Sequence, residues 1–184
     1  YDASKFKDSY ISNHPKVADA KLSSANEIIY CFWTGDNPLT ENRKKNLEIF
    51  KKTSGVPLIL VTDENLEDYI LPEHPIHPAY YNLSYNHRSD YLRCYFMHYH
   101  GGGYADVKKN ESNWANAFKK LNNNPSKWAC GYTEIAPSGV PTIGGEIERT
   151  LRLNYFRLIG NGAFIFFFRC PQLPKNGLLK YTTF

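Results

Sequence analysis

Acidic and basic side chains gather in the segment 88–108, which reads RSDYLRCYFMHYHGGGYADVK. Asp90 and Arg93 are three residues apart, a spacing that places both side chains on one face of a helix. Glycines at 101–103 allow a sharp turn, and Asp106 follows in a short strand. On spacing alone a surface ion pair is the commoner outcome for Asp90 and Arg93. Together with Asp106, however, the pair would bind sugar hydroxyls, a diphosphate or a divalent metal.

Further candidates follow two strands that we expect to be buried. Trp33, Thr34 and Gly35 come after the first strand, and Thr62 and Asp63 end the second. Open α/β sheets bind their ligands at the carboxyl ends of the strands. An aromatic ring, a hydroxyl and an open backbone suit a base and a ribose, although plain turn residues remain the alternative interpretation.

The hydrophobic pattern predicts the elements that position these residues. Continuous apolar runs indicate buried strands, and the first two strands are separated by a helical segment, which favours a parallel sheet with right-handed crossovers. Thr40 is expected to cap the first helix, and Gly55 to end it. The fold class is therefore α/β, with a mixed, mainly parallel sheet flanked by helices in a single domain. Strands are expected at 27–33, 56–62, 104–108, 127–135 and 160–168, and helices at 40–54, 84–100 and 113–121.

Composition excludes some classes of function. The 184 residues carry a formal net charge of +4, and their basic residues are scattered among acidic ones. A dedicated nucleic-acid binder would cluster its basic residues, so we expect no nucleic-acid partner, whereas a small anionic ligand fits. No apolar run is long enough to span a membrane. The four cysteines form no CxxC pair, which favours buried thiols over disulfides or zinc ligands and favours a cytoplasmic location, in a host cell if the protein is viral.

The ordered motifs resemble those of a known family. The segment 89–108 resembles the Ser-Asp-x-x-Arg … Gly-Gly-x-Tyr-x-Asp-x-Asp signature of nucleotide-sugar-dependent glycosyltransferases of the GT-A (Rossmann-like) fold. IIYCFWTG is similar to the first strand of that family, and GNGAFIF to a later strand that carries an Asn. The similarity covers residues 27–166 in matching order. The similar groups include glycosyltransferases with a DXD sugar-binding region, capsular polysaccharide synthesis proteins, and the enzymes that large algal viruses use on capsid proteins.

The resemblance implies a hexosyl- or deoxyhexosyltransferase that uses a nucleoside-diphosphate sugar, UDP-linked by preference, and a hydroxyl of a glycan or glycoprotein. It implies that Asp90 and Arg93 hold the donor sugar and its phosphates, with Asn161 near the diphosphate. Asp106 would bind the ribose or a metal. Glu134 could reach the donor sugar or the acceptor, and an exposed charge at a strand end is the alternative. The implied nucleotide site comprises Trp33, Thr34, Gly35, Thr62 and Asp63.

One position departs from the family pattern. The second acid of the DXD motif, usually the main metal ligand, is Lys108 here. Mn²⁺ or Mg²⁺ prefers carboxylate oxygens, whereas an ammonium could neutralise a phosphate itself. Three interpretations follow: a metal held by Asp106 with other ligands, a metal-free cationic site, or a degraded enzyme. We expect the first, because Asp106 and its neighbours are intact.

Two further functions stay open. A non-catalytic module that binds sugar nucleotides or glycans is favoured by Lys108, and a phosphate-binding structural or nucleic-acid module by the positive charge alone. No carboxylate base for an inverting enzyme stands out in the sequence. The similar DXD enzymes are largely retaining, so retention of anomeric configuration is favoured.

The ends of the chain differ from its centre. Residues 1–26 are polar and weakly patterned, and we expect them to be a linker or the tail of a preceding domain in a longer protein. Residues 27–166 form the expected glycosyltransferase domain, and residues 167–184 an atypical tail. The degenerate codons of 175–184, read one base earlier, can encode an amphipathic helix start, so we hypothesise a frameshift near Phe166.

Overall fold

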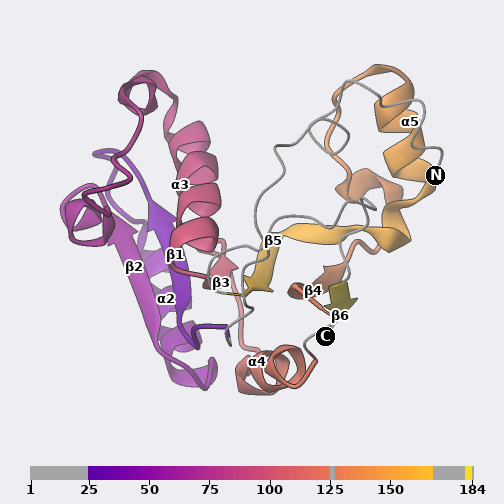
Figure 1. The fold of residues 1–184 in the computed structure, drawn as a ribbon, viewed down its shortest axis with the longest axis horizontal. Coiled ribbons are helices and arrows are strands. Elements are labelled where there is room, and N and C mark those ends of the chain that lie inside the picture. The colour runs from indigo at the N-terminus through magenta and orange to yellow at the C-terminus, as the bar shows by residue number, and fades with distance from the viewer. Residues whose placement is uncertain (1–24, 125–126, 168–180, 184) are drawn as a thin grey trace.

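The computed structural model describes residues 25–124, 127–167 and 181–183. Strands and helices alternate along most of this length (Figure 1). The strands are β1 (Ile29–Trp33), β2 (Leu58–Thr62), β3 (Gly102–Ala105), β4 (Ala129–Thr133), β5 (Ile159–Phe166) and β6 (Tyr181–Thr183). The α-helices are α2 (Glu41–Thr53), α3 (Tyr85–Tyr99), α4 (Ala115–Asn122) and α5 (Gly145–Leu153). Short 3₁₀ turns are η2 (Leu66–Tyr69), η3 (Pro78–Asn82), η4 (Pro137–Gly139) and η5 (Tyr155–Arg157).

The strands form one mixed sheet in the order β2-β1-β3-β5-β4-β6. β1 lies between β2 and β3 and is parallel to both. β5 is antiparallel to β3 and to β4, and β6 is parallel to β4. The predicted α/β fold with a mixed sheet and flanking helices is thus confirmed, as is the parallel pairing of the first two strands. The sheet is less strictly parallel than predicted, because β5 runs antiparallel to both of its neighbours.

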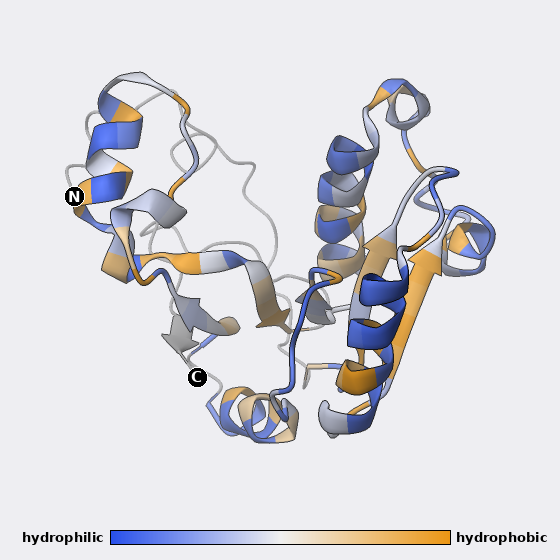
Figure 2. Ribbon diagram, turned by 180° about the vertical axis from the view of Figure 1, so that it is seen from behind, coloured by the Kyte–Doolittle hydropathy of each residue, from blue (hydrophilic) through white to orange (hydrophobic). Residues whose placement is uncertain are grey.

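Two apolar clusters pack against opposite faces of this sheet. Ile29 and Cys31 of β1 belong to the cluster that α2 and α4 cover, and Tyr30 and Phe32 to the cluster under α3. This division follows from the alternation of side chains along a strand. Figure 2 shows the apolar strands β1 and β2 behind the polar outer surface of α2. Helix α3 covers this second face of the sheet, and its first turn meets the end of β1, where the Thr34 hydroxyl donates to the Tyr85 carbonyl.

Local signals fix the ends of the two long helices. The Thr40 hydroxyl accepts a hydrogen bond from the Arg43 amide at the start of α2, as predicted for a cap. Ser84 caps α3 in the same way through the His87 amide. The helix then ends at Tyr99, so the predicted helix over 84–100 is confirmed to within a residue at each end.

The glycines after α3 do more than end the helix. The sequence suggested a strand at 104–108, whereas β3 begins at Gly102 and ends before Asp106. Gly102 has a φ of 89°, and a Cβ there would lie 2.7 Å from the Ile28 carbonyl oxygen. Glycine is required because β1 approaches too closely for a side chain. Helix α5 lies in a part of the chain for which the sequence predicted no helix.

Several sequence predictions concern residues outside this description. Residues 1–24, most of the predicted linker, lie there, and so does the tail apart from Phe167 and β6, so both the linker and the frameshift stay predictions. Among the described cysteines, Cys31 and Cys130 are buried free thiols, as predicted. Cys94 is also a free thiol, but it is exposed on α3, so the prediction of burial is wrong there. Cys170 lies outside the described residues. Within the described residues, no helix combines the length and the apolar character needed to cross a bilayer.

Candidate functional site

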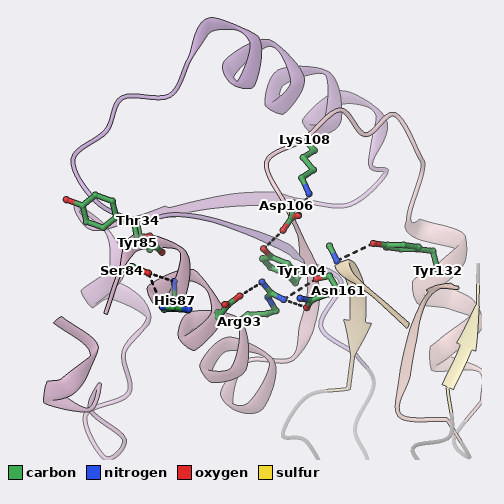
Figure 3. A network of polar contacts seen from close by, with 12 residues as sticks. Thr34, Ser84, Tyr85, His87, Arg93, Tyr104, Asp106, Lys108, Tyr132 and Asn161 are labelled. Atoms are coloured by element: carbon green, nitrogen blue, oxygen red, sulfur yellow. Dashed lines mark hydrogen bonds and ion pairs between the residues drawn. The ribbon is translucent and has the colours of Figure 1, made fainter. Parts of the chain in front are cut away.

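Arg93 of α3 contacts three neighbouring residues (Figure 3). Its Nη2 lies 2.6 Å from Oδ1 of Asp90, one turn earlier on the same helix. Its Nη1 donates to the backbone oxygen of Asn161 at 3.2 Å and also to the Asn161 side chain. The guanidinium carbon lies 4.5 Å from the centre of the Tyr104 ring. The predicted pair is therefore more than a surface ion pair, because strands β3 and β5 complete it.

Asp106 lies on the other side of Tyr104. Its Oδ1 accepts a hydrogen bond of 2.5 Å from the Tyr104 hydroxyl, and its Oδ2 lies 2.6 Å from Nζ of Lys108. Burial first, and then the hydrogen bond to Asp106, raise the pKa of the Tyr104 phenol. Tyr104 therefore stays protonated and acts as a donor throughout the physiological pH range.

The pairing of β3 with β5 brings the two groups together. Ala105 lies opposite Ala163, and the Asp106 amide donates to the Gly162 carbonyl at 2.9 Å. A Cβ at Gly162 would lie only 3.1 Å from the Asp106 carboxylate. A side chain at Gly162 would thus crowd Asp106, and Asn161, the residue before it, reaches Arg93. The predicted cluster of Asp90, Arg93, Asp106 and Asn161 is one connected network in the structure.

A cleft of about 320 Å³ opens beside Asp106 at the carboxyl end of β1. Two of the predicted nucleotide-site residues, Trp33 and Thr34, line it, and Lys108 lies at the same cleft. The Trp33 indole donates to the Asn37 carbonyl, and the Thr34 hydroxyl donates to the Tyr85 carbonyl. Both side chains are thus fixed by local hydrogen bonds while they face the cleft. Among the described residues, its lining comprises Phe32, Trp33, Thr34, Asn37, Arg43, Tyr85, Asn86, Ser89, Tyr104, Asp106, Val107 and Lys108.

The other predicted nucleotide-site residues do not line this cleft. Gly35 has a φ of 88°, and a Cβ there would lie 2.6 Å from the Tyr85 ring. Its amide donates to Oδ2 of Asp63, which also lies 3.9 Å from Arg88. Gly35 and Asp63 therefore hold the loop that carries Thr34. Thr62 ends β2, next to Trp33 in the sheet, and its amide donates to the Asn65 side chain.

Glu134 lies apart from the cleft. It lines a separate cavity of about 500 Å³ between the sheet and the segment that contains η4, α5 and η5. Asn161 and Arg157 also line this cavity, and most of its wall is apolar. Because Asn161 also binds Arg93, this residue connects the cavity to the network of α3.

One family model matches the N-terminal part of the chain. The model, described as capsular polysaccharide synthesis protein, matches residues 3–107, more than half of the 184 residues. The chain belongs to this family. Neither the curated proteins nor the solved structures compared with it contain a significant match.

The family match includes part of the network and stops before the rest. It contains Asp90, Arg93 and Asp106 with the elements from β1 to β3, and it ends at Val107, one residue before Lys108. Asn161 and Glu134 lie beyond it. The finer resemblance to GT-A glycosyltransferases with a DXD motif, and to those of algal viruses, stays a prediction.

The donor atoms around Asp106 do not fit a divalent metal held by the protein. Both carboxylate oxygens of Asp106 already contact Tyr104 and Lys108. Throughout the part of the chain that the structure describes, no three His, Cys, Asp or Glu side chains gather in an arrangement that could hold a metal ion. Mn²⁺ and Mg²⁺ prefer several oxygen ligands, and an ammonium beside the one carboxylate repels a cation. The expected metal at Asp106 stays a prediction without support from this geometry.

Sequence reasoning missed two residues of the site. Tyr104 links Arg93 to Asp106, and its position two residues before Asp106 puts both on the same side of β3, a signal that the period of a strand could have supplied. Arg43 also lines the cleft. Its guanidinium carbon lies 5.1 Å from the centre of the Trp33 ring, and its Nη1 donates to the Val107 carbonyl at 2.6 Å. Its neighbours come from distant parts of the sequence, so spacing gave no sign of its place.

Proposed function

We propose that this protein is a glycosyltransferase that moves a sugar from a nucleoside-diphosphate sugar, UDP-linked by preference, to a hydroxyl of a glycan or glycoprotein acceptor. The observation that supports it most is the network in which Tyr104 joins the Asp90–Arg93 pair to Asp106 beside an open cleft. Membership in the capsular polysaccharide synthesis family agrees with this proposal.

The proposed donor lies along the network. The nucleoside occupies the cleft beside Trp33, with its ribose hydroxyls at Asp106. The donor sugar lies towards Asp90, whose side chain is 55% exposed and can accept hydrogen bonds from sugar hydroxyls. Arg93 holds Asp90 and Asn161 in place, since its own guanidinium already contacts both.

The chemistry requires departure of a nucleoside diphosphate from an anomeric carbon. Positive charge near the phosphates lowers the barrier, because negative charge develops on the leaving group. The acceptor hydroxyl must be positioned opposite, and we assign this role to the cavity of Glu134, which adjoins Asn161. No step is assigned to a metal, because the donor atoms do not fit one. Retention of anomeric configuration and a cytoplasmic location are part of the proposal.

Donor hydrolysis tests this function. The full chain, incubated with a panel of UDP- and GDP-sugars both in EDTA and in Mn²⁺, should release nucleoside diphosphate slowly from one donor. The anomeric configuration of the released sugar, followed by proton NMR at early times, should be that of the donor. No release and no nucleotide binding with any donor would refute the proposal.

A second candidate is a non-catalytic module that binds sugar nucleotides. The ion pair between Lys108 and Asp106 favours it, because an acid is expected at position 108 in a DXD enzyme. A clear thermal shift with a nucleotide sugar, without turnover in the presence of glycan acceptors, would favour this module over the enzyme.

A further inference from the structure

Two cationic side chains, Arg43 and Lys108, line the proposed nucleotide cleft. They suggest which groups neutralise the negative charge of a bound nucleotide. We propose that Lys108, assisted by Arg43, neutralises the diphosphate of the donor in place of a divalent cation, so that nucleoside diphosphates bind without metal. This inference rests on the proposed function, since it names the groups that meet the phosphates at the same site.

Lys108 is free to move onto a phosphate. Its side chain is 71% exposed, and its one contact in the network is the ion pair with Asp106. Exposed ion pairs contribute little to stability, and lysine carries its charge on a flexible four-carbon stem. The ammonium can therefore leave Asp106, or bridge Asp106 and a phosphate, at small cost.

Arg43 places a second positive charge at the same cleft. Its Nη1 donates to the Val107 carbonyl, which fixes the backbone between Asp106 and Lys108. The charged residues that line the cleft are Arg43, Lys108 and Asp106, so cations outnumber carboxylates. This balance suits an anionic ligand, whereas a cleft built to bind a divalent cation would carry an excess of carboxylates.

The Lys108 ammonium carries the same net charge as a DXD acid and its bound divalent ion would carry together. A carboxylate at position 108 with a bound divalent ion would supply one negative and two positive charges, which leaves one positive charge. The Lys108 ammonium supplies the same single charge without a metal. A lysine thus supplies the same net positive charge near a leaving diphosphate as an acid with a bound divalent ion, while it removes the ligand that a metal needs.

Binding of UDP and GDP, measured by isothermal titration calorimetry in EDTA and then in Mn²⁺, tests the inference independently of turnover. We expect the full chain to bind one of them equally well in both buffers. Lys108→Met keeps most of the length of the side chain without its charge, and it should weaken binding roughly 10- to 100-fold in EDTA. Lys109→Met is the matched control, because Lys109 is exposed, pairs with Glu111 and does not line the cleft.

A second variant, Lys108→Asp, restores the second acid of the DXD motif. Lys108→Asp should bind the nucleotide poorly in EDTA and recover affinity in Mn²⁺, because it offers a second carboxylate beside Asp106. The inference is wrong if the unmodified chain binds the nucleotide only in Mn²⁺, or if Lys108→Met and Lys109→Met bind equally in EDTA; the proposed function would survive both results. If neither nucleotide binds in either buffer, the proposed function fails, and the inference fails with it.

Discussion

Arg93 and Lys108 lie on either side of Tyr104, and they differ in exposure and in the contacts that they make. Arg93 is only 14% exposed, contacts Asp90 and Asn161, and stacks on the Tyr104 ring. Lys108 is 71% exposed and has a single ion pair with Asp106. The Arg93 side chain is thus fixed by its contacts within the protein, whereas the Lys108 side chain is available to a ligand.

The difference separates two tasks that charge performs in a binding site. A fixed guanidinium orients neighbouring polar groups, and its planar fork is pre-organised for several hydrogen bonds at once. An exposed ammonium gives up little when it changes partners. We therefore expect changes at Arg93 to alter both stability and activity, and changes around Lys108 to alter ligand binding with little effect on folding.

The largest effect should come from Arg93→Ala. It leaves Asp90 and Asn161 without their shared donor, so the free energy of unfolding should fall by about 2 kcal/mol. Turnover should fall roughly 100-fold or more, because the polar groups at the donor sugar lose their orientation. Urea denaturation and donor hydrolysis measure the two effects.

Arg93→Lys is the matched variant for that experiment. It keeps the charge but cannot make the fork of hydrogen bonds, so it should restore little of the free energy of unfolding or of the turnover. Full recovery with lysine would show that Arg93 acts by charge alone, and the contrast with Lys108 would disappear.

Asp106→Asn should reduce turnover roughly 10- to 100-fold, because a charged acceptor for sugar or ribose hydroxyls becomes neutral. The change keeps an acceptor for the Tyr104 hydroxyl and breaks only the exposed pair with Lys108. The free energy of unfolding should change by less than about 1 kcal/mol. Unchanged turnover would remove Asp106 from the proposed site.

Tyr104→Phe separates the stacking on Arg93 from the hydrogen bond to Asp106. Wild type should be more stable by about 1 to 2 kcal/mol at neutral pH, since a hydrogen bond to a carboxylate is lost. The raised pKa of Tyr104 means that this advantage is fully present below the usual tyrosine value near 10. It should shrink only above that pH, as the unfolded chain begins to ionise its tyrosine.

Chemical denaturation of both proteins between pH 6 and pH 11 measures this difference. A difference that already shrinks between pH 6 and pH 9 would contradict the role of Tyr104 as a protonated donor to Asp106.

The smallest effect should come from Thr62→Val. Thr62 was a candidate from its place at a strand end, yet it does not line the cleft. Nucleotide affinity should stay within about twofold of wild type, well below the tenfold change that about 1.4 kcal/mol would cause. A loss as large as that of Lys108→Met would extend the site to the end of β2 and weaken the contrast between the two cations.

The sequence predicted local features well because their causes are local. Thr40 and Ser84 cap helices through their own next turn, and the apolar runs of β1 and β2 form neighbouring strands as predicted. β1 is mostly buried as predicted, whereas β2 lies at the sheet edge and is fully buried only at Val61. The pairing of Asp90 with Arg93 also followed from helical spacing alone.

Features that depend on distant neighbours escaped prediction. Position 102 needs a glycine because the Ile28 carbonyl, just before β1, lies too close for a side chain, and Arg43 joins the cleft because its helix packs beside the turn at Val107. Thr62 and Trp33 end neighbouring strands, yet only Trp33 lines the cleft. Such placements depend on the direction of side chains after packing, which the spacing of residues does not contain.

The decisive experiment is a crystal structure of the full chain with the nucleotide sugar that the hydrolysis panel selects. We expect the nucleoside beside Trp33 and Asp106, the diphosphate in contact with Lys108, and the sugar towards Asp90. Electron density for the nucleotide at any other surface, with the cleft beside Asp106 left empty, would contradict it.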